Sequence, residues 1–402
     1  MVNHYAVPPG QSGGTRHWVL GRFLHMAGHD VSIIAANVNY QSRQGSAPSG
    51  ELYRARLENV DGIRFLWLDV PEYANALQRV WSMIIFALRA LVGRAPSYLP
   101  RPDVIIGSTP HPFAALAAYL LSRRHKARFV LEVRDIWPES LVDVGGYSWA
   151  NPLIRAVDIL EKFPLRRADR VISLLPNAAE DLVAKGAIPE KIVWIPNGID
   201  ATLFNNPGPA IDGPEFKVLY AGAHGLANGL DVMVDAAKLL QERQVSDIQF
   251  ILVGDGARKP ALAKRVEELG LTNISFRDSV PKAEMPAVLS EANACFLHLR
   301  DLPVFRWGVS PNKLFDYMAA ARPVIFAVNT TNNPVEEAGA GRTIPPEDPQ
   351  ALADAVCSLS QLSSGERQRQ GSQGRDYVMT RHTDGVLGAK LLKTLEQLVS
   401  RG

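Results

Sequence analysis

The chain is poor in cysteine, with two among its 402 residues. Cys295 lies in the apolar run ACFLHL and Cys357 in the run ADAVCSL, so we expect both to be small core residues in a reducing compartment. Neither belongs to a CxxC pair, and no cluster has the spacing of metal ligands. The composition therefore excludes a disulfide-stabilised scaffold and gives no support to a structural zinc site.

Long apolar runs are also missing. No segment reaches the roughly 18 uninterrupted apolar residues of a membrane-spanning helix. The closest is residues 77–94, where arginines interrupt the apolar side chains. This segment suits either a helix in a membrane interface or a core helix of the first domain, and we expect the core helix. The N-terminus lacks a basic region followed by an apolar one, so we expect no signal peptide.

Charge of one sign is not in excess. The formal net charge is +2, which does not indicate nucleic-acid binding, and we expect no nucleic-acid partner. A dinucleotide fingerprint is absent as well, because the glycine-rich turn GQSGGTRHW (residues 10–18) does not match GxGxxG.

Apolar strands alternate with amphipathic helices through two similar halves of the chain. In the first half, a strand is expected at residues 30–38 and a helix at residues 112–125. In the second half, FKVLYAG begins a strand at Phe216 and residues 230–243 form a helix. Strands separated by helices imply parallel sheets that are covered on both faces.

The boundary between the halves falls within residues 196–214, which are rich in Pro, Gly, Asn and Asp. We expect an N-terminal domain at residues 1–196 and a C-terminal domain at residues 197–380. A helical segment at residues 381–402 should pack back toward the N-terminal domain. The fold class is therefore α/β, with two Rossmann-like doubly wound domains facing across a cleft at the carboxyl ends of their strands.

The segment SPNKLFDYMAAARPVIFA, residues 310–327, carries the most chemical information. Ser310 and the proline after it can start a helix, which a second proline ends before a buried strand. This arrangement aims free backbone N–H groups and Lys313 at one spot, with Asp316 one turn further on. The N–H groups and the ammonium suit a diphosphate, and the carboxylate suits a pair of ribose hydroxyls. An ordinary helix–strand unit with incidental charges fits the same residues equally well.

The segment GDGARK, residues 254–259, follows the apolar strand FILV and allows a tight turn into a helix. Lys259 points into the same strand-end region, so beside Lys313 it predicts a two-lysine clamp on a pyrophosphate. Such turns are common in α/β proteins, and alone this one is a weak signal.

In the first half, Gly13 and Gly14 let the backbone approach a ligand just before a helix whose N-terminus favours an anion. His111 follows the strand VIIG, where we expect it to reach the cleft, and a structural role is the alternative. Asp135, after the strand in EVRDIWPES, could position an acceptor hydroxyl or act as a base. A loop anchored by its aromatic residue is the alternative there.

Together these segments resemble glycosyltransferase family 4, the retaining GT-B enzymes that use nucleotide sugars. The likeness covers nearly the whole chain and depends on the order of GGTRHWVLGRFLHMAGHDV, PNGID, YAGAHGLANGLDVMVDAA, ILVGDGARK and SPNKLFDYMAAARPVI. The segments VNHYAVPP, EVRDIWPES and SPNKLFDYM are most similar to the branch assigned to aminodeoxyhexose (fucosamine-type) transfer in bacterial O-antigen or capsule assembly.

The resemblance implies a role for each matching position. His111 would contact the donor sugar near its anomeric carbon, and Lys259 would neutralise the leaving diphosphate. Asp316 takes the place of the family's ribose-binding glutamate, and the turn at Val280 would cradle the base. The expected catalytic residues are His111, Asp135 and Lys259. The expected donor-binding residues are Gly13, Gly14, Gly222, Gly254, Lys259, Val280, Ser310, Lys313 and Asp316.

The sequence departs from the family pattern at the donor site. Gly308 stands eight residues before Asp316, where the family often has a glutamate, and Asp316 itself is one methylene shorter than the usual glutamate. Ala223 and Asn228 stand where many members have an arginine and a lysine. The phosphate site would then depend more on the two lysines of the second half and on backbone N–H groups.

The resemblance implies retaining transfer of a hexose or an N-acetylated (deoxy)hexosamine from a UDP-sugar to a lipid-linked or saccharide acceptor. The setting would be bacterial surface polysaccharide synthesis, such as that of lipopolysaccharide O-antigen. No metal or other cofactor is expected, because no Asp-x-Asp-like pair stands at a strand end. We expect a cytoplasmic location with peripheral contact at the inner membrane. A GT-B UDP-sugar epimerase and a non-catalytic GT-B binding module are the alternatives.

Overall fold

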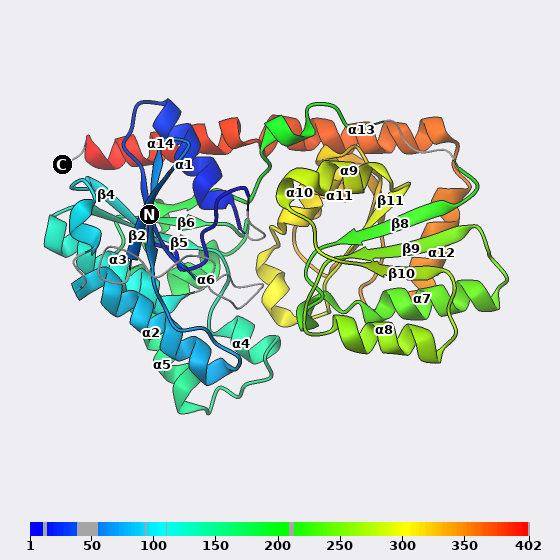
Figure 1. The fold of residues 1–402 in the computed structure, drawn as a ribbon, viewed down its shortest axis with the longest axis horizontal. Coiled ribbons are helices and arrows are strands. Elements are labelled where there is room, and N and C mark those ends of the chain that lie inside the picture. Colours follow the sequence, from blue (N-terminus) through cyan, green and yellow to red (C-terminus); the bar gives the residue numbers. More distant parts are fainter. Residues whose placement is uncertain (11–13, 38–54, 93–94, 110, 209–212, 401–402) are drawn as a thin grey trace. The chain divides into compact units, whose positions relative to one another are not determined.

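The computed structural model describes residues 1–10, 14–37, 55–92, 95–109, 111–208 and 213–400. The chain divides into two compact units (Figure 1). Unit 1 consists of Met1–Pro196 and Asp384–Gly402, and unit 2 of Asn197–Thr383. The last helix of the chain therefore belongs to the same unit as the first.

Unit 1 contains a sheet in two parts that Val2 joins. In the described residues the strand orders are β1-β3-β2 and β4-β5-β6-β7, and Val2 forms parallel bridges to Ile34 and Gly107. Neighbouring strands are parallel except β2 and β3. The strands are β1 (Ser32–Ala36), β2 (Ala55–Val60), β3 (Ile63–Leu68), β4 (Val104–Ser108), β5 (Arg128–Val133), β6 (Arg170–Ser173) and β7 (Ile192–Trp194).

Helices cover both faces of this sheet (Figure 1). On one face α1 and α14 pack together, and Trp18, Phe65 and Leu391 belong to the apolar core beneath them. On the other face α2 packs against α3, and α3 against α5. The helices are α1 (Arg16–Met26), α2 (Ala76–Val92), α3 (Pro112–His125), α4 (Glu139–Asp143), α5 (Pro152–Arg167), α6 (Ala179–Ala184) and α14 (Asp384–Val399).

Unit 2 contains a parallel sheet in the order β10-β9-β8-β11-β12-β13. Its strands are β8 (Phe216–Ala221), β9 (Ile248–Val253), β10 (Ile274–Arg277), β11 (Ala294–His298), β12 (Val324–Ala327) and β13 (Gly341–Thr343). Since all these strands run the same way, their carboxyl ends share one edge, where ligands bind in such sheets.

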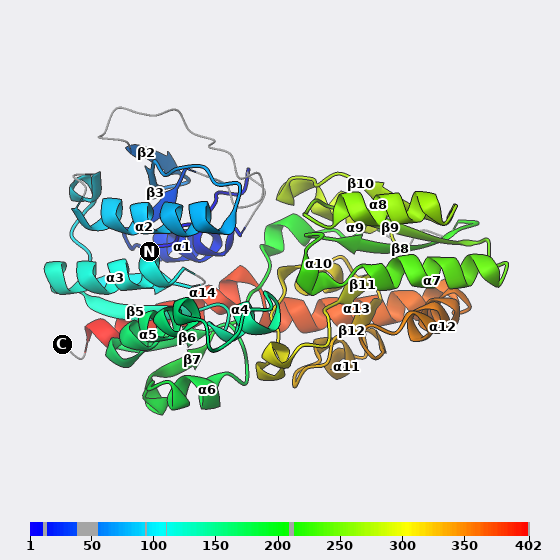
Figure 2. The same ribbon diagram turned by 90° about the horizontal axis from the view of Figure 1, so that it is seen from below.

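Two apolar cores flank the sheet of unit 2. Figure 2 shows the helices of unit 2 around this sheet. Met233, Phe250 and Val356 belong to one core, and Phe315 and Val378 belong to the other. The helices are α7 (Asp231–Glu242), α8 (Lys259–Glu268), α9 (Met285–Ser290), α10 (Asn312–Ala319), α11 (Pro334–Ala338), α12 (Pro349–Ser360) and α13 (Ser364–Arg381).

Several helices begin where the sequence supplies a capping side chain. Asn151 and Asp348 accept hydrogen bonds from backbone N–H groups of the first turns of α5 and α12, and each is followed by proline. Ser363 and Glu366 form a reciprocal capping box at α13. These caps satisfy backbone donors that a helix cannot pair internally, and they fix where the elements start.

The predicted alternation of parallel strands and helices is confirmed, but the sequence analysis missed the antiparallel hairpin of β2 and β3. Its two-residue turn is Asp61-Gly62, with φ values of 52° and 85°. Positive φ at both central residues matches the type I′ turn that joins tightly connected antiparallel strands. Phe65 and Leu66 of β3 are buried, so the hairpin adds its inner strand to the core.

The segment predicted as a core helix forms α2, which is apolar on two faces. Phe86 and Ala90 are fully buried, whereas Leu77, Trp81 and Val92 are 80%, 55% and 79% exposed. The core interpretation therefore holds for one face only. Among the described helices, none combines the length and the apolar character needed to cross a membrane.

Candidate active site

The predicted donor-binding residues of unit 2 lie at the carboxyl edge of its sheet or at the start of α10. Gly222 follows β8, Gly254 follows β9 and Val280 follows β10. Lys313 lies in the first turn of α10, and Asp316 lies one turn further. The structure thus gathers these positions at the edge where the parallel sheet places them.

Two loops approach each other closely at this edge. Gly222 and Gly254 have φ values of 154° and 141°, in a region that favours glycine. A Cβ atom at Gly254 would lie 2.0 Å from the carbonyl oxygen of Gly222, and one at Gly222 would lie 3.1 Å from Cε of Lys313. Both positions therefore need glycine, and the β8 loop lies directly against the lysine side chain.

Lys313 is surrounded by neutral partners. Its Nζ donates to the Tyr220 hydroxyl at 2.6 Å and to Oδ1 of Asn228 at 2.7 Å, and it lies 4.4 Å from the centroid of the Tyr220 ring. Burial lowers the pKa of Lys313 to about 7. Because the hydrogen bonds formed by this ammonium leave its charge without a carboxylate partner, the site is suited to accept an anion.

Lys259, the other lysine of the predicted clamp, has acidic partners of its own. Its Nζ lies 2.7 Å from Oδ1 of Asp278 and 3.2 Å from Oδ1 of Asp255, and it also donates to the carbonyl oxygen of Arg277. Two carboxylates therefore already balance its charge. A diphosphate would have to compete with these carboxylates for Lys259, which the sequence did not indicate.

His224, which the sequence analysis did not single out, lies in the loop after β8 and is fully buried. Its ring packs near Tyr220 and Phe276, and in the described part of the chain neither ring nitrogen has a hydrogen-bond partner. Burial and the nearby charge of Lys259 lower the pKa of His224 to about 4. The imidazole is therefore neutral near pH 7. No motif in the sequence indicated that His224 would lie at this site.

Asp316 is buried, and Lys282 Nζ donates to its Oδ2 at 2.5 Å. The sequence analysis did not predict this lysine.

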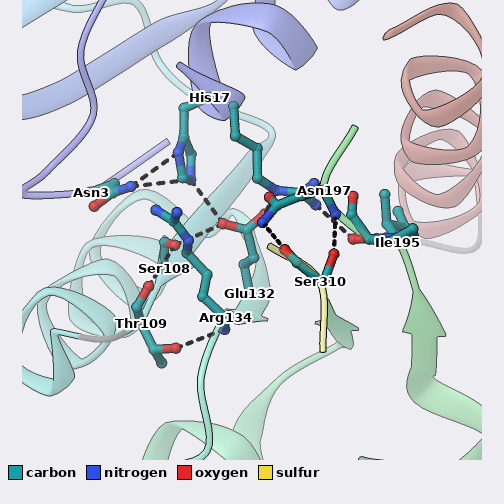
Figure 3. A network of polar contacts seen from close by, with 11 residues as sticks. Asn3, His17, Ser108, Thr109, Glu132, Arg134, Ile195, Asn197 and Ser310 are labelled. Atoms are coloured by element: carbon teal, nitrogen blue, oxygen red, sulfur yellow. Dashed lines mark hydrogen bonds and ion pairs between the residues drawn. The ribbon is translucent and has the colours of Figure 1, made fainter. Parts of the chain in front are cut away.

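Val280 is partly buried against the apolar core beneath α10. Ser310 Oγ accepts from the backbone N–H of Asn197 at 2.8 Å, and its carbonyl oxygen accepts from Asn197 Nδ2 at 2.7 Å (Figure 3). Ser310 thus anchors the first residue of unit 2 to the start of α10.

In unit 1 a buried ionic network fixes the start of α1 (Figure 3). Glu132 in β5 accepts from Arg16 Nε at 2.8 Å and from Ser108 Oγ at 2.7 Å, and its Oε2 lies 2.9 Å from His17 Nε2. Burial opposes ionisation of this carboxyl, but Arg16 and His17 outweigh it and hold the pKa of Glu132 well below its usual range. The network ties the first two residues of α1 to the central strands β4 and β5.

His111 is not the accessible strand-end side chain that we expected. It is fully buried, its Nδ1 accepts from the backbone N–H of Ala114 at 2.7 Å, and so it caps α3. Its ring lies 4.9 Å from that of His4 and 5.5 Å from that of Phe86. Burial holds its pKa well below the usual range, so the imidazole is neutral. Within the described residues Nε2 has no partner.

Asp135 and Gly14, two further predicted residues of unit 1, lie near the segment that follows β5. Asp135 follows β5 and is exposed. A Cβ atom at Gly14 would lie 3.5 Å from Nη2 of Arg134, so the Arg134 side chain borders this loop. Gly13 lies outside the described residues. Among the described residues, no group of three or more His, Cys, Asp or Glu side chains is arranged to hold a metal ion.

Comparison with known proteins shows the family of the chain. Residues 13–198 match the model of the glycosyl transferase 4-like domain, and residues 215–361 match the model of glycosyl transferases group 1. The chain is 27% identical over 313 residues to WcaI of Escherichia coli, a protein named for glycosyl transfer in colanic acid biosynthesis; the match covers 74% of this chain and 75% of that protein.

Solved structures show the same fold. Sucrose-phosphate synthase from Thermosynechococcus elongatus is 20% identical with a TM-score of 0.74, and the match covers 97% of this chain and 94% of that one. Anabaena HepE, solved in complex with UDP and glucose, is 13% identical with a TM-score of 0.67, covering 96% and 97%. These likenesses confirm the predicted fold class, a GT-B fold with two Rossmann-like domains.

Proposed function

Because the chain belongs to glycosyltransferase family 4 and has the GT-B fold, we propose that it transfers a sugar with retention from a UDP-sugar donor. The sugar is a hexose or an N-acetylated (deoxy)hexosamine. The observation that carries this proposal is Lys313, an ammonium held by Tyr220 and Asn228 beside the tightly packed Gly222 loop. UDP in the HepE structure supports a uridine nucleotide as the carrier.

In this proposal, unit 2 binds the donor through its diphosphate. Asn228 stands where many family members have a lysine, and here it accepts a hydrogen bond from Lys313. The cation missing from the β8 loop is thus supplied by α10. Lys313 and the first N–H groups of α10 then stabilise the charge that grows on the leaving diphosphate as the glycosidic bond breaks. This assigns the electrostatic work to the protein without a metal ion.

In this proposal, unit 1 supplies the acceptor side. Asp135 is exposed at the end of β5 and has the chemistry to orient or deprotonate an acceptor hydroxyl. His111 is neutral, and its Nδ1 caps α3. Its role in transfer would therefore be a contact through Nε2 to the donor sugar. The acceptor hydroxyl attacks from the face that the diphosphate leaves, which preserves the anomeric configuration.

We further propose that the acceptor is a lipid-linked saccharide of bacterial surface polysaccharide synthesis, at the cytoplasmic face of the inner membrane. The similarity to a colanic acid protein supports the pathway class. Helix α2 supports peripheral contact with a membrane surface, because it exposes the apolar side chains of Leu77, Trp81 and Val92. Exposed apolar side chains that lie together on one helix face usually mark a surface that contacts a partner or a membrane.

The test is release of UDP by the purified protein from a panel of UDP-hexoses and UDP-N-acetylhexosamines, with and without lipid-linked saccharides. We expect acceptor-dependent release, a product whose anomeric configuration by NMR matches the donor, and a loss of at least about tenfold in kcat/KM for Lys313→Met. Conversion of the donor without any acceptor would instead indicate an epimerase. Calorimetry without heat from any UDP compound would indicate a non-catalytic module.

A further inference from the structure

The carboxylate of Asp316 is only half satisfied. Its Oδ2 accepts from Lys282 Nζ at 2.5 Å, while its Oδ1 is buried and has no hydrogen-bond partner among the residues that the structure describes. The residue as a whole is 6% exposed. A buried acceptor without a donor costs free energy, so the site is suited to a ligand that brings an O–H or N–H group to Oδ1.

Lys282 offers the complementary chemistry on the other side of this pair. It begins a short 3-10 turn, Lys282–Glu284, two residues after Val280, and its side chain is 21% exposed. An ammonium carries three N–H donors, and in the described part of the chain Asp316 is the hydrogen-bond acceptor for one of them. The other two N–H groups are available to an acceptor on a ligand.

We propose that Lys282 and Asp316 form a composite ribose site, in which Asp316 Oδ1 accepts from one hydroxyl of the ribose and Lys282 Nζ donates to the other. This rests on the proposed function, since it concerns the ribose of the same UDP-sugar donor. Lys282 is thereby a substrate-binding residue that the sequence analysis did not identify.

A vicinal diol fits this pair because each hydroxyl both donates and accepts. An anionic acceptor and a cationic donor held 2.5 Å apart present one partner of each kind to adjacent oxygens. The pairing also addresses the short reach of Asp316. A carboxylate one methylene shorter than glutamate can leave one hydroxyl to a neighbouring ammonium instead of bonding both itself. The site thus selects ribonucleotides over their deoxy forms.

The experiment is calorimetric titration of the full chain with UDP, 2′-deoxy-UDP and 3′-deoxy-UDP. We expect the wild-type protein to bind each deoxy compound about tenfold or more weakly than UDP, as loss of one charge-assisted hydrogen bond implies. Lys282→Met should abolish the loss of affinity for one of the two deoxy compounds and keep it for the other. Asp316→Asn should weaken the loss of affinity that Lys282→Met keeps. Lys282→Arg should retain both penalties.

The control is Lys264→Met, which removes an exposed lysine of the same unit, 75% accessible, and should bind all three ligands like the wild type. Because Lys282→Met leaves a buried carboxylate without its counter-charge, the double variant Lys282→Met/Asp316→Asn is included, and it should lose both penalties. Wild-type binding of UDP without discrimination against either deoxy compound overturns the composite site but leaves the proposed function standing. Unchanged penalties in Lys282→Met also overturn it. Absence of UDP binding by the wild-type protein overturns both proposals.

Discussion

The environment of Lys313 predicts that binding of the donor diphosphate is coupled to uptake of a proton. Burial among neutral partners lowers its pKa to about 7 in the free protein. A bound diphosphate favours the charged form of Lys313 and raises its pKa. The affinity for the diphosphate is therefore highest below pH 7, and it falls as the pH rises from 7 toward the pKa of Lys313 in the complex. Over that window the fall is about tenfold per pH unit. At pH 8 about a tenth of the free protein carries the charge, so about 0.9 proton should enter with each UDP.

The assay is titration with UDP at pH 8 in buffers of different ionisation enthalpy, followed by affinity measurements from pH 7 to 9. This range lies above the titration of a terminal phosphate near pH 6, which would otherwise add its own proton. Lys313→Met should bind UDP weakly, with no proton uptake and little pH dependence, while Lys264→Met should behave as the wild type. Wild-type binding without proton uptake, or uptake that persists in Lys313→Met, would refute the reasoning.

Three further outcomes are expected. Glu132→Gln should lower the free energy of unfolding in urea by about 3 kcal/mol, because the buried Arg16 guanidinium loses its counter-charge and the His17 imidazole loses a charged hydrogen-bond partner; a change under about 1 kcal/mol would contradict this. Gly254→Ala should cost at least about 2 kcal/mol and about tenfold in UDP affinity, since its Cβ would meet the Gly222 carbonyl; wild-type melting and binding would argue against the close approach. Leu77→Ser/Trp81→Ser should reduce flotation with phosphatidylglycerol vesicles at unchanged melting temperature, and equal flotation would remove the membrane proposal.

Much of the fold follows from local patterns in the sequence. Apolar runs such as FKVLYA and IQFILV predicted the parallel strands of unit 2, which are buried on both faces. The hairpin of β2 and β3 was not predicted, because strands were expected to alternate with helices. The Asp-Gly turn at residues 61–62 was the local signal for it.

The candidate site was only partly predictable. Strand ends and a helix start identified Gly222, Gly254 and Lys313, because parallel topology alone brings such positions to one edge. The ionic partner of each charged side chain could not be predicted from residue spacing. Lys259 meets Asp278, and Asp316 meets Lys282, through contacts between segments 19 and 34 residues apart. Such pairings depend on tertiary packing and carry no local signal.

The packing of α14 in unit 1 has a consequence for how the protein is made. Gly388 of α14 lies so close to α1 that a Cβ atom there would meet the Phe23 ring at 2.3 Å. Leu387, Leu391 and Leu398 share an apolar core with Trp18, Leu20 and Leu24 of α1, which are translated more than 300 positions earlier. A nascent chain therefore carries an open apolar face through the synthesis of all of unit 2, and premature termination near Thr383 would leave that face as an aggregation site.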